Sequence, residues 1–197
     1  PSVALIGSRH ASASGLHISH DLAAEVSRHG VCIVSGFAAG IDTAAHQGCV
    51  QAQGKTIAVL GTGIDRVYPA ANRDLARRIS QSGLLLSEFP LGTAPIAHNF
   101  PRRNRIIAGL SQAIIVVEAT LESGSLITAR LGLEMNKEVM AVPGSIHNPQ
   151  SKGCHALIKQ GAKLVECVND ILEECPRLPQ IRPVNELTKE KSTPTTC

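Results

Sequence analysis

Hydrophobic residues in this chain follow two alternating patterns. Some short runs are almost continuously apolar, which is typical of strands buried on both faces. Longer segments between them repeat apolar residues every three or four positions, the spacing of a helix with one buried side. The predicted strands are residues 3–7, 31–36, 56–61, 84–88, 113–119, 138–144 and 163–166. The predicted helices are residues 16–29, 41–52, 72–81, 125–135 and 154–160.

The order of these elements predicts the fold class. Strands that alternate with helices pair in parallel, and strands that are apolar on both faces need helices on both sides. We therefore expect an α/β fold with a doubly wound, mostly parallel sheet and helices on both faces. Ligands of such sheets bind beyond the carboxyl ends of the strands. Glycine and serine concentrate at those ends in this sequence.

Elements run without a linker from Val3 to about Glu174, so residues 1–174 are expected to form one domain. Residues 175–197 contain four prolines and few large apolar residues, which predicts a flexible C-terminal tail or linker. A strand begins almost at Pro1, so we also expect the chain to be a fragment of a longer protein.

Charge and composition narrow the function classes. The 19 Lys and Arg residues against 16 Asp and Glu give a net charge of only +3, so any anion site must be local. No apolar run approaches the roughly 18 residues of a membrane span, which predicts a soluble, cytoplasmic protein without a membrane partner. The six cysteines form no CxxC pair, so we expect reduced structural thiols and no metal site.

Two strand ends have the features of anion sites. In "VSGFAAGID" a strand ends near Ser35 and Gly36, and a helix begins near Gly40, which leaves unpaired amides and a positive helix end. In "LESGSLITAR" Ser123 or Ser125 is expected to cap a helix, and Gly124 lets a ligand approach the backbone. Each turn alone is equally consistent with ordinary capping, but the two together favour phosphate binding.

Several enzyme motifs are incomplete or absent. "GTGIDR" has Arg66 where a dinucleotide fingerprint needs its third glycine, and "GCVQAQGKT" leads into a strand instead of following one. The sequence contains no GxSxG elbow and no HExxH pair. Glu88 and Glu118 end strands and could act as bases, but ion pairing with an arginine is favoured. We therefore expect no cofactor and no catalytic residue.

The stretch "FPRRNRIIAGL" places three arginines at the head of an apolar helix that Asn99 is expected to cap. Helical spacing prevents the three guanidinium groups from all pointing one way. Each arginine could cover the edge of the core or pair with Glu88 or Glu118. Alternatively, at least one reaches a phosphate, because the planar guanidinium group matches phosphate oxygens.

The chain has only four aromatic residues, and each lies in a strand-end motif: Phe37, Tyr68, Phe89 and Phe100. Aromatic rings beside phosphate sites favour a single strand of nucleic acid, since stacking contributes roughly 1–3 kcal/mol per base. Alternatively, the side chains of Phe89 and Phe100 only fill the space beneath the loop between them and contact no ligand.

A family resemblance rests on motifs that occur in one order over residues 2–174: "VALIGSR", "SGFAAGIDTAAH", "GTGIDRVYP", "SEFPLGTAP", "FPRRNRIIAGLS", "VVEATLESGSLITAR", "VPGS" and "GCHALIKQGA". The chain resembles the DprA/Smf family of DNA-processing proteins. The resemblance implies an extended Rossmann-like fold and sequence-independent binding of single-stranded DNA in natural transformation. It also implies a homodimer, protection of incoming DNA, loading of RecA recombinase, and no catalysed reaction.

The resemblance also implies a phosphate-binding edge. Arg102 falls on a variable position of the family's FPxRNR motif, and Lys152 is a weaker candidate for a backbone contact. The helical N-terminal and winged-helix C-terminal modules of many members are not in this sequence. The implied DNA-binding residues are Ser8, Arg9, Ser35, Gly36, Phe37, Gly40, Arg103, Asn104, Arg105, Ser123, Gly124, Ser125 and Lys152.

Two other functions stay open from the sequence. DprA also resembles the Rossmann-type phosphoribohydrolases of nucleoside monophosphates, although the PGGxGTxxE signature of those enzymes is absent here. A structural protein that uses the crevice for dimerisation is the third possibility. The surfaces for dimerisation and for RecA are not assigned by the sequence.

Overall fold

The structure is a computed structural model that describes residues 1–175. Its sheet has seven strands in the order β4-β3-β2-β1-β5-β6-β7, and each pairing in this part of the chain is parallel. The strands are β1 (Ser2–Ile6), β2 (Cys32–Ser35), β3 (Thr56–Val59), β4 (Leu84–Leu86), β5 (Ala113–Val116), β6 (Glu138–Ala141) and β7 (Lys163–Leu164). The predicted doubly wound, Rossmann-like α/β fold is confirmed.

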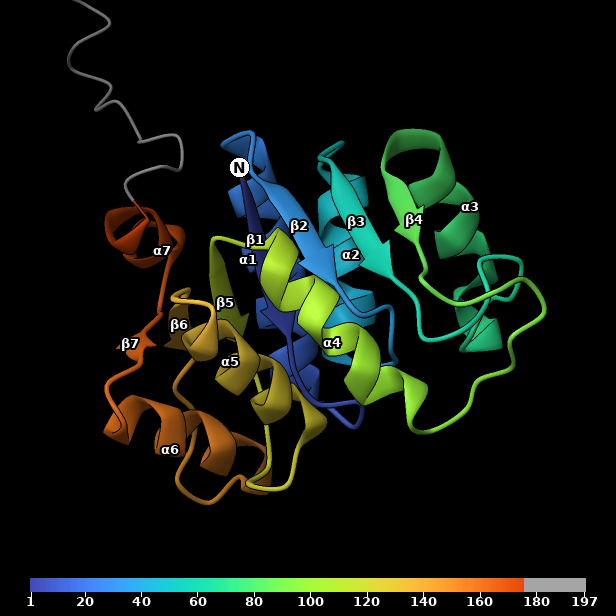
Figure 1. Ribbon diagram of the computed structural model, residues 1–197. Coiled ribbons are helices and arrows are strands. Elements are labelled where there is room, and N and C mark those ends of the chain that lie inside the picture. Colours follow the sequence, from blue (N-terminus) through green and yellow to red (C-terminus); the bar gives the residue numbers. More distant parts are fainter. Residues whose placement is uncertain (176–197) are drawn as a thin grey trace, which may run out of the picture.

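Helices cover both faces of this sheet. The helices are α1 (Ala13–Arg28), α2 (Ile41–Gln51), α3 (Arg73–Ser82), α4 (Asn99–Leu110), α5 (Gly124–Glu134), α6 (Lys152–Lys159) and α7 (Val168–Glu174), with 3₁₀ turns η1 (Ala70–Asn72) and η2 (Pro149–Ser151). In Figure 1, α4 and α5 lie in front of the central strands, while α1 and α2 lie behind them. Each face therefore has its own hydrophobic core.

Successive strand residues enter opposite cores because strand side chains alternate between the two faces. Ile115 packs with Leu22 and Ile33 in the core beneath α1 and α2. Its neighbour Ile114 packs with Ile107 in the core beneath α4 and α5. This alternation explains the continuous apolar runs of the sequence.

The sheet order creates a point where chain connections diverge. From β1 the chain proceeds outward through β2, β3 and β4, and it then returns to β5 on the other side of β1. The loops after β1 and β5 therefore leave in opposite directions, and the space between them is the usual ligand position in an open α/β sheet.

Two local predictions need correction, and one helix was not predicted. Helix α1 begins at Ala13, earlier than predicted, because the Ser12 hydroxyl accepts a hydrogen bond from the Gly15 N–H at 3.0 Å. Asn99 does not cap α4 but is its first helical residue, after His98. Helix α7 was not predicted; its first turn is held by Asp170, which accepts a hydrogen bond from the Cys167 N–H at 3.0 Å.

The predicted tail falls almost entirely on residues 176–197, which lie outside the described residues. Within residues 1–175, no helix combines the length and the apolar character needed to cross a bilayer.

Candidate functional site

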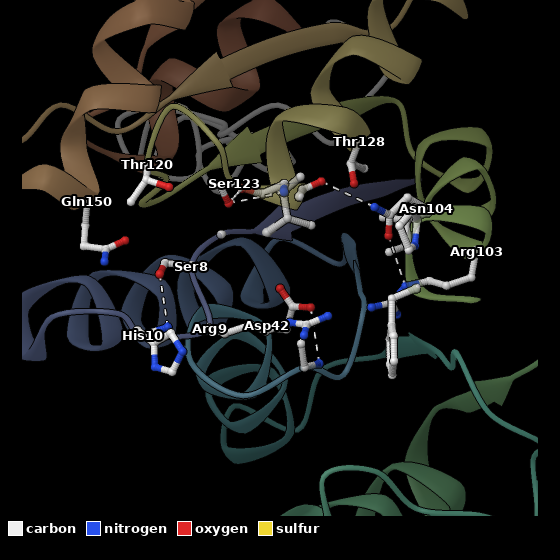
Figure 2. Close-up of a pocket in the computed structure, with 18 residues that line it drawn as sticks. Ser8, Arg9, His10, Asp42, Arg103, Asn104, Thr120, Ser123, Thr128 and Gln150 are labelled. Carbon is white, nitrogen blue, oxygen red and sulfur yellow. Dashed lines mark hydrogen bonds between the residues drawn. The ribbon is translucent and has the colours of Figure 1, made fainter. Parts of the chain in front are cut away.

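A crevice of about 360 Å³ opens at the carboxyl ends of β1 and β5, where the chain connections diverge. Figure 2 shows Ser8, His10 and Asp42 on one side of it and Thr120, Ser123 and Asn104 across from them. Its main polar and aromatic lining residues are Ser8, Arg9, His10, Asp42, Phe100, Arg103, Asn104, Thr120, Ser123, Ser125, Thr128 and Gln150.

The loop between β1 and α1 forms one wall and is fixed by Glu118. The Ser8 N–H donates to the Glu118 carbonyl oxygen at 2.7 Å. The Glu118 carboxylate accepts from the N–H and the hydroxyl of Ser12 at 2.8 and 2.6 Å. The expected pairing of Glu118 with an arginine is therefore wrong. This carboxylate instead holds the wall that carries Ser8 and Arg9.

The loop between β2 and α2 packs directly against that wall. Gly40 has a φ of 79°, and a Cβ at this position would lie 2.2 Å from the Ser8 carbonyl oxygen. Only glycine therefore permits this approach. The Ser35 side chain is fully buried and donates to the Leu5 carbonyl oxygen, so it joins β2 to β1 and does not line the crevice.

Phe37 is a core residue in this conformation. Its side chain is 1% exposed, and its ring centroid lies 5.8 Å from that of His46. The ring was expected near a ligand, but it is not accessible for stacking on one. The sequence could not show this, because the turn around Phe37 directs the ring inward beneath α2 and α3, where it packs with Leu75 and Ile79.

His46 makes stability pH-dependent. Its Nδ1 lies 2.7 Å from the Thr56 hydroxyl, and its Nε2 has no hydrogen-bond partner among the described residues. Burial, with a smaller contribution from Arg103, lowers the pKa of His46 to about 3. The native imidazole is therefore neutral, whereas the unfolded one takes up a proton below its ordinary pKa of about 6.5.

We predict that this difference lowers the free energy of unfolding by about 1.4 kcal/mol at pH 5.5, relative to pH 8, and by more at lower pH. Urea unfolding at a series of pH values measures the effect. In His46→Gln, the loss of stability between pH 8 and pH 5.5 should be smaller by that amount; an unchanged pH profile would contradict the assignment.

Arg103 lies beneath the crevice and is 3% exposed. Its guanidinium group donates to the carbonyl oxygens of Gly36 and Val59, and its Nε donates to the Asn104 Oδ1 at 3.1 Å. A Cβ on Gly36 would lie 2.4 Å from the Arg103 Nη2. Arg103 therefore joins the ends of β2 and β3 to α4 and presents little surface to a ligand.

A buried carboxylate accompanies this arginine. Burial raises the pKa of Asp42, while the positive charge of Arg103 acts in the opposite direction. Burial lowers the pKa of Arg103 to about 10, so the guanidinium group stays charged at neutral pH. Because Arg103 is buried, Arg9 is the exposed arginine in the lining of the crevice.

Arg9 lies over an aromatic ring at the mouth of the crevice. Its Cζ is 5.0 Å from the centroid of Phe100, within the range of a cation–π contact. The ring centroid of Tyr68 lies 5.7 Å from that of Phe100, and Tyr68 is 45% exposed. A slot of about 60 Å³ is lined by these three side chains. The arrangement offers a positive charge and flat apolar surfaces side by side.

The N-terminus of α5 forms the opposite wall. The Ser123 hydroxyl accepts from the Ser125 N–H at 3.3 Å, which confirms the predicted cap. A Cβ at Gly124 would meet no atom within 4 Å, so the backbone here is open to a ligand. The Asn104 amide donates to the Gly124 carbonyl oxygen at 3.4 Å. The Ser123 N–H donates to the Thr120 carbonyl oxygen, so among the described residues of this turn the Gly124 N–H is the one left for an anion, which a helix N-terminus favours.

The remaining predicted residues lie outside the crevice lining. Arg105 forms an ion pair with Glu88, which is one of the alternatives that the sequence offered for this arginine. Arg102 is exposed and lies 5.9 Å from the centroid of the Phe89 ring. Lys152 is the exposed first residue of α6. Contacts of these residues with a nucleic acid stay predictions.

The crevice also contains residues that the sequence did not single out. His10 directly follows the motif VALIGSR, so a wider reading of that motif could have included it. Asp42 lies within SGFAAGIDTAAH, and Thr120 and Thr128 lie within VVEATLESGSLITAR, but their side chains were not assigned to the site. Gln150 lies outside the motifs, and only the packing of η2 brings it to the crevice. Among residues 1–175, no group of His, Cys, Asp or Glu side chains could hold a metal ion.

Residues 1–176 match the family model of DNA recombination-mediator protein A. The chain belongs to this family. Protein Smf of Escherichia coli K12 is 50% identical over 172 residues, which are 87% of this chain and 46% of that protein. The chain thus spans about half the length of the E. coli relative, and 45% of the Synechocystis protein Smf.

Two solved structures of family members share this fold. DNA processing protein A of Streptococcus pneumoniae superposes with a TM-score of 0.82 at 46% identity, over 88% of this chain and 61% of that one. The corresponding protein of Helicobacter pylori, described with its single-stranded DNA binding mode, has a TM-score of 0.81 at 32% identity. That match covers 89% of this chain and 80% of the other.

Proposed function

We propose that this chain binds single-stranded DNA without sequence preference, in the crevice between the β1–α1 loop and the N-terminus of α5. The observation that carries the proposal is the exposed Arg9 over the Phe100 ring, across from the open amides at Gly124. The structure of the Helicobacter pylori family member, described with its single-stranded DNA binding mode, supports it.

Each part of the crevice has a role in this proposal. Phosphate oxygens accept hydrogen bonds from the Gly124 N–H at the N-terminus of α5 and from Arg9. A base stacks against Tyr68 and Phe100, and any base offers a face for this contact. Contacts to the DNA backbone and to the faces of the bases do not distinguish one base from another, because sequence is recognised at the base edges. Binding is therefore independent of sequence. Ser35, Phe37 and Arg103 are buried and support the crevice from the core without contacting DNA, whereas the other predicted residues are proposed as DNA contacts.

The cellular role is part of the same proposal. A recombination-mediator family supports a protein that protects incoming single strands in natural transformation and helps load RecA onto them. We propose that it acts in the cytoplasm as a homodimer and catalyses no reaction. Residues 1–174 form its DNA-binding domain, and residues 175–197 serve as a tail or linker.

Binding of oligo-dT and of a matched duplex across a salt series tests the proposal. Preferential binding of the single strand is expected, and log K should fall with log salt with a slope of about −0.7 for each phosphate that is neutralised. Equal affinity for the two DNAs, or a flat salt response, would rule the proposed function out.

A nucleoside monophosphate is the second candidate ligand, because a crevice of about 360 Å³ is within the range of small-molecule sites. In a phosphoribohydrolase a carboxylate would assist attack of water on the glycosidic bond, and Asp42 is the carboxylate that lines the crevice. Release of free base from nucleoside monophosphates would support this enzyme; no release at high protein concentration would exclude it.

The three arginines of α4 should differ in their effect on DNA affinity. Arg102 is exposed, stacks loosely on Phe89 and lies away from the crevice, so Arg102→Ala should change affinity least, by less than about threefold. Arg105→Ala releases Glu88 and should cost more. Fluorescence anisotropy with oligo-dT measures both. A larger loss for Arg102→Ala than for Arg105→Ala would reverse this ranking.

A further inference from the structure

A second cavity adjoins the crevice on the side of α1 and α2. It has a volume of about 600 Å³ and lies between the N-terminal halves of these helices. Arg9 and His10 line both cavities, so the two meet at the β1–α1 loop. We name the second cavity the α1–α2 groove; its polar lining residues are Arg9, His10, His17, His20, Thr43 and Gln47.

The groove is lined by histidines and by no carboxylate. His10 comes from the loop, whereas His17 and His20 lie three residues apart on the same side of α1. The His17 side chain is 78% exposed and that of His20 is 31% exposed. Helix α2 contributes only uncharged groups to the groove. Its charge therefore depends on the protonation of three imidazoles.

One carboxylate opposes these imidazoles from the rim. The Asp21 carboxylate lies 3.2 Å from the His17 Nε2 and 2.9 Å from the His20 Nδ1. The hydrogen bond that the Asp21 carboxylate accepts from the His20 Nδ1 raises the pKa of His20 despite partial burial, and the His20 Nε2 lies 2.8 Å from the Gln51 Oε1. Glu25 and Arg28 follow on the same helix and offset one another.

The groove consequently gains positive charge when its imidazoles are protonated. While they are neutral, Arg9 and Asp21 balance. Protonation adds positive charge that Asp21 alone cannot neutralise. A polyanion that leaves the crevice past Arg9 would then meet a positive surface.

We propose that the α1–α2 groove is a pH-dependent extension of the strand-binding site, in which the positive charge of protonated His17 and His20 attracts the phosphates next to those bound in the crevice. This inference rests on the proposed function, since it assigns a path to the same single strand. From Ala13 to His20, α1 rises about 10 Å, which is enough for a short further stretch of strand.

Oligo-dT of two lengths separates the groove from the crevice. About 4 nucleotides occupy the crevice, and about 20 nucleotides extend beyond it. Thymine and phosphodiester groups do not change their charge between about pH 7.5 and pH 6.0, so pH acts through the protein. We expect acidification to strengthen binding of the longer strand about fivefold more than binding of the shorter one.

The variant His17→Gln/His20→Gln should lose this additional gain while binding the short strand as before. His29→Gln is the matched control, because His29 follows the last residue of α1, at the far end from the crevice, and it should keep the gain. Asp21→Asn should bind the long strand more tightly than the unaltered protein at about pH 6.0, since protonated imidazoles are then unopposed; a merely structural role of the histidines predicts no such increase.

An equal pH response of the two oligonucleotides in the unaltered protein would overturn the inference. So would a gain that persists in the double histidine variant. Both results leave the proposed function intact, because the short strand still binds. Absence of binding for both lengths at both pH values would overturn the proposed function itself and this inference with it.

Discussion

Replacing Arg103 with methionine should lower the free energy of unfolding by about 3 kcal/mol or more. The substitution removes the donors to the carbonyl oxygens of Gly36 and Val59 and leaves Asp42 buried without its nearby positive charge. Methionine has a similar length but cannot donate a hydrogen bond. Urea unfolding followed by circular dichroism measures the loss.

The control for this prediction lies on the same helix. Arg105→Met removes an exposed guanidinium group that pairs with Glu88, and exposed ion pairs contribute less than about 1 kcal/mol. Arg103→Lys keeps the charge but cannot reach both carbonyl oxygens with a planar group, so an intermediate loss is expected. If Arg103→Met is as stable as Arg105→Met, Arg103 does not hold the strand ends together.

The second large effect concerns DNA affinity. Arg9→Ala should weaken binding of oligo-dT by about thirtyfold, because it removes the exposed arginine of the crevice and the cation that covers the Phe100 ring. The salt dependence of binding should become shallower by about 0.7, corresponding to one phosphate contact. Fluorescence anisotropy at several salt concentrations measures both quantities.

Stability should change little in Arg9→Ala, since the side chain is exposed and lies over the Phe100 ring without a buried ion pair among residues 1–175. Arg130→Ala is the matched control, because Arg130 is exposed on α5 and does not line the crevice. It removes the same charge and should cost less than about twofold. Equal losses in the two variants would mean that net charge, and not the position of Arg9, governs binding.

Local sequence patterns were sufficient for the architecture and for part of the site. The strand residues alternate between two apolar environments, so a sheet covered on both faces follows from the sequence alone. The cap at Ser123 also follows, because the hydroxyl bonds to the N–H of Ser125, only two residues away. The start of α1 was missed because its first residues, Ala13, Ser14 and Gly15, are small or polar and gave no apolar period. Helix α7 was missed because it has only seven residues, although Val168, Ile171 and Leu172 have helical spacing.

The arginines of α4 show what local sequence patterns could and could not predict. Arg103 lies four residues before the buried Ile107, so the helical period could have placed it on the inner face. Its partners could not be read in the same way. The carbonyl groups of Gly36 and Val59 are 67 and 44 residues away in the sequence. The expected pairing of Glu118 with an arginine failed for the same reason, since Ser12 is 106 residues away.

By itself, the sequence determined the doubly wound sheet, the edge of the sheet at which the crevice lies and the helix N-terminus suited to an anion. Each of these depends on periodicity or on contacts within one turn of chain. Only the tertiary structure decided that Arg103 stabilises the strand ends while Arg9 faces the crevice, and that Phe37 is buried while Phe100 lies beneath Arg9. Those assignments depend on which segments far apart in the sequence pack together, and local sequence patterns do not predict that packing.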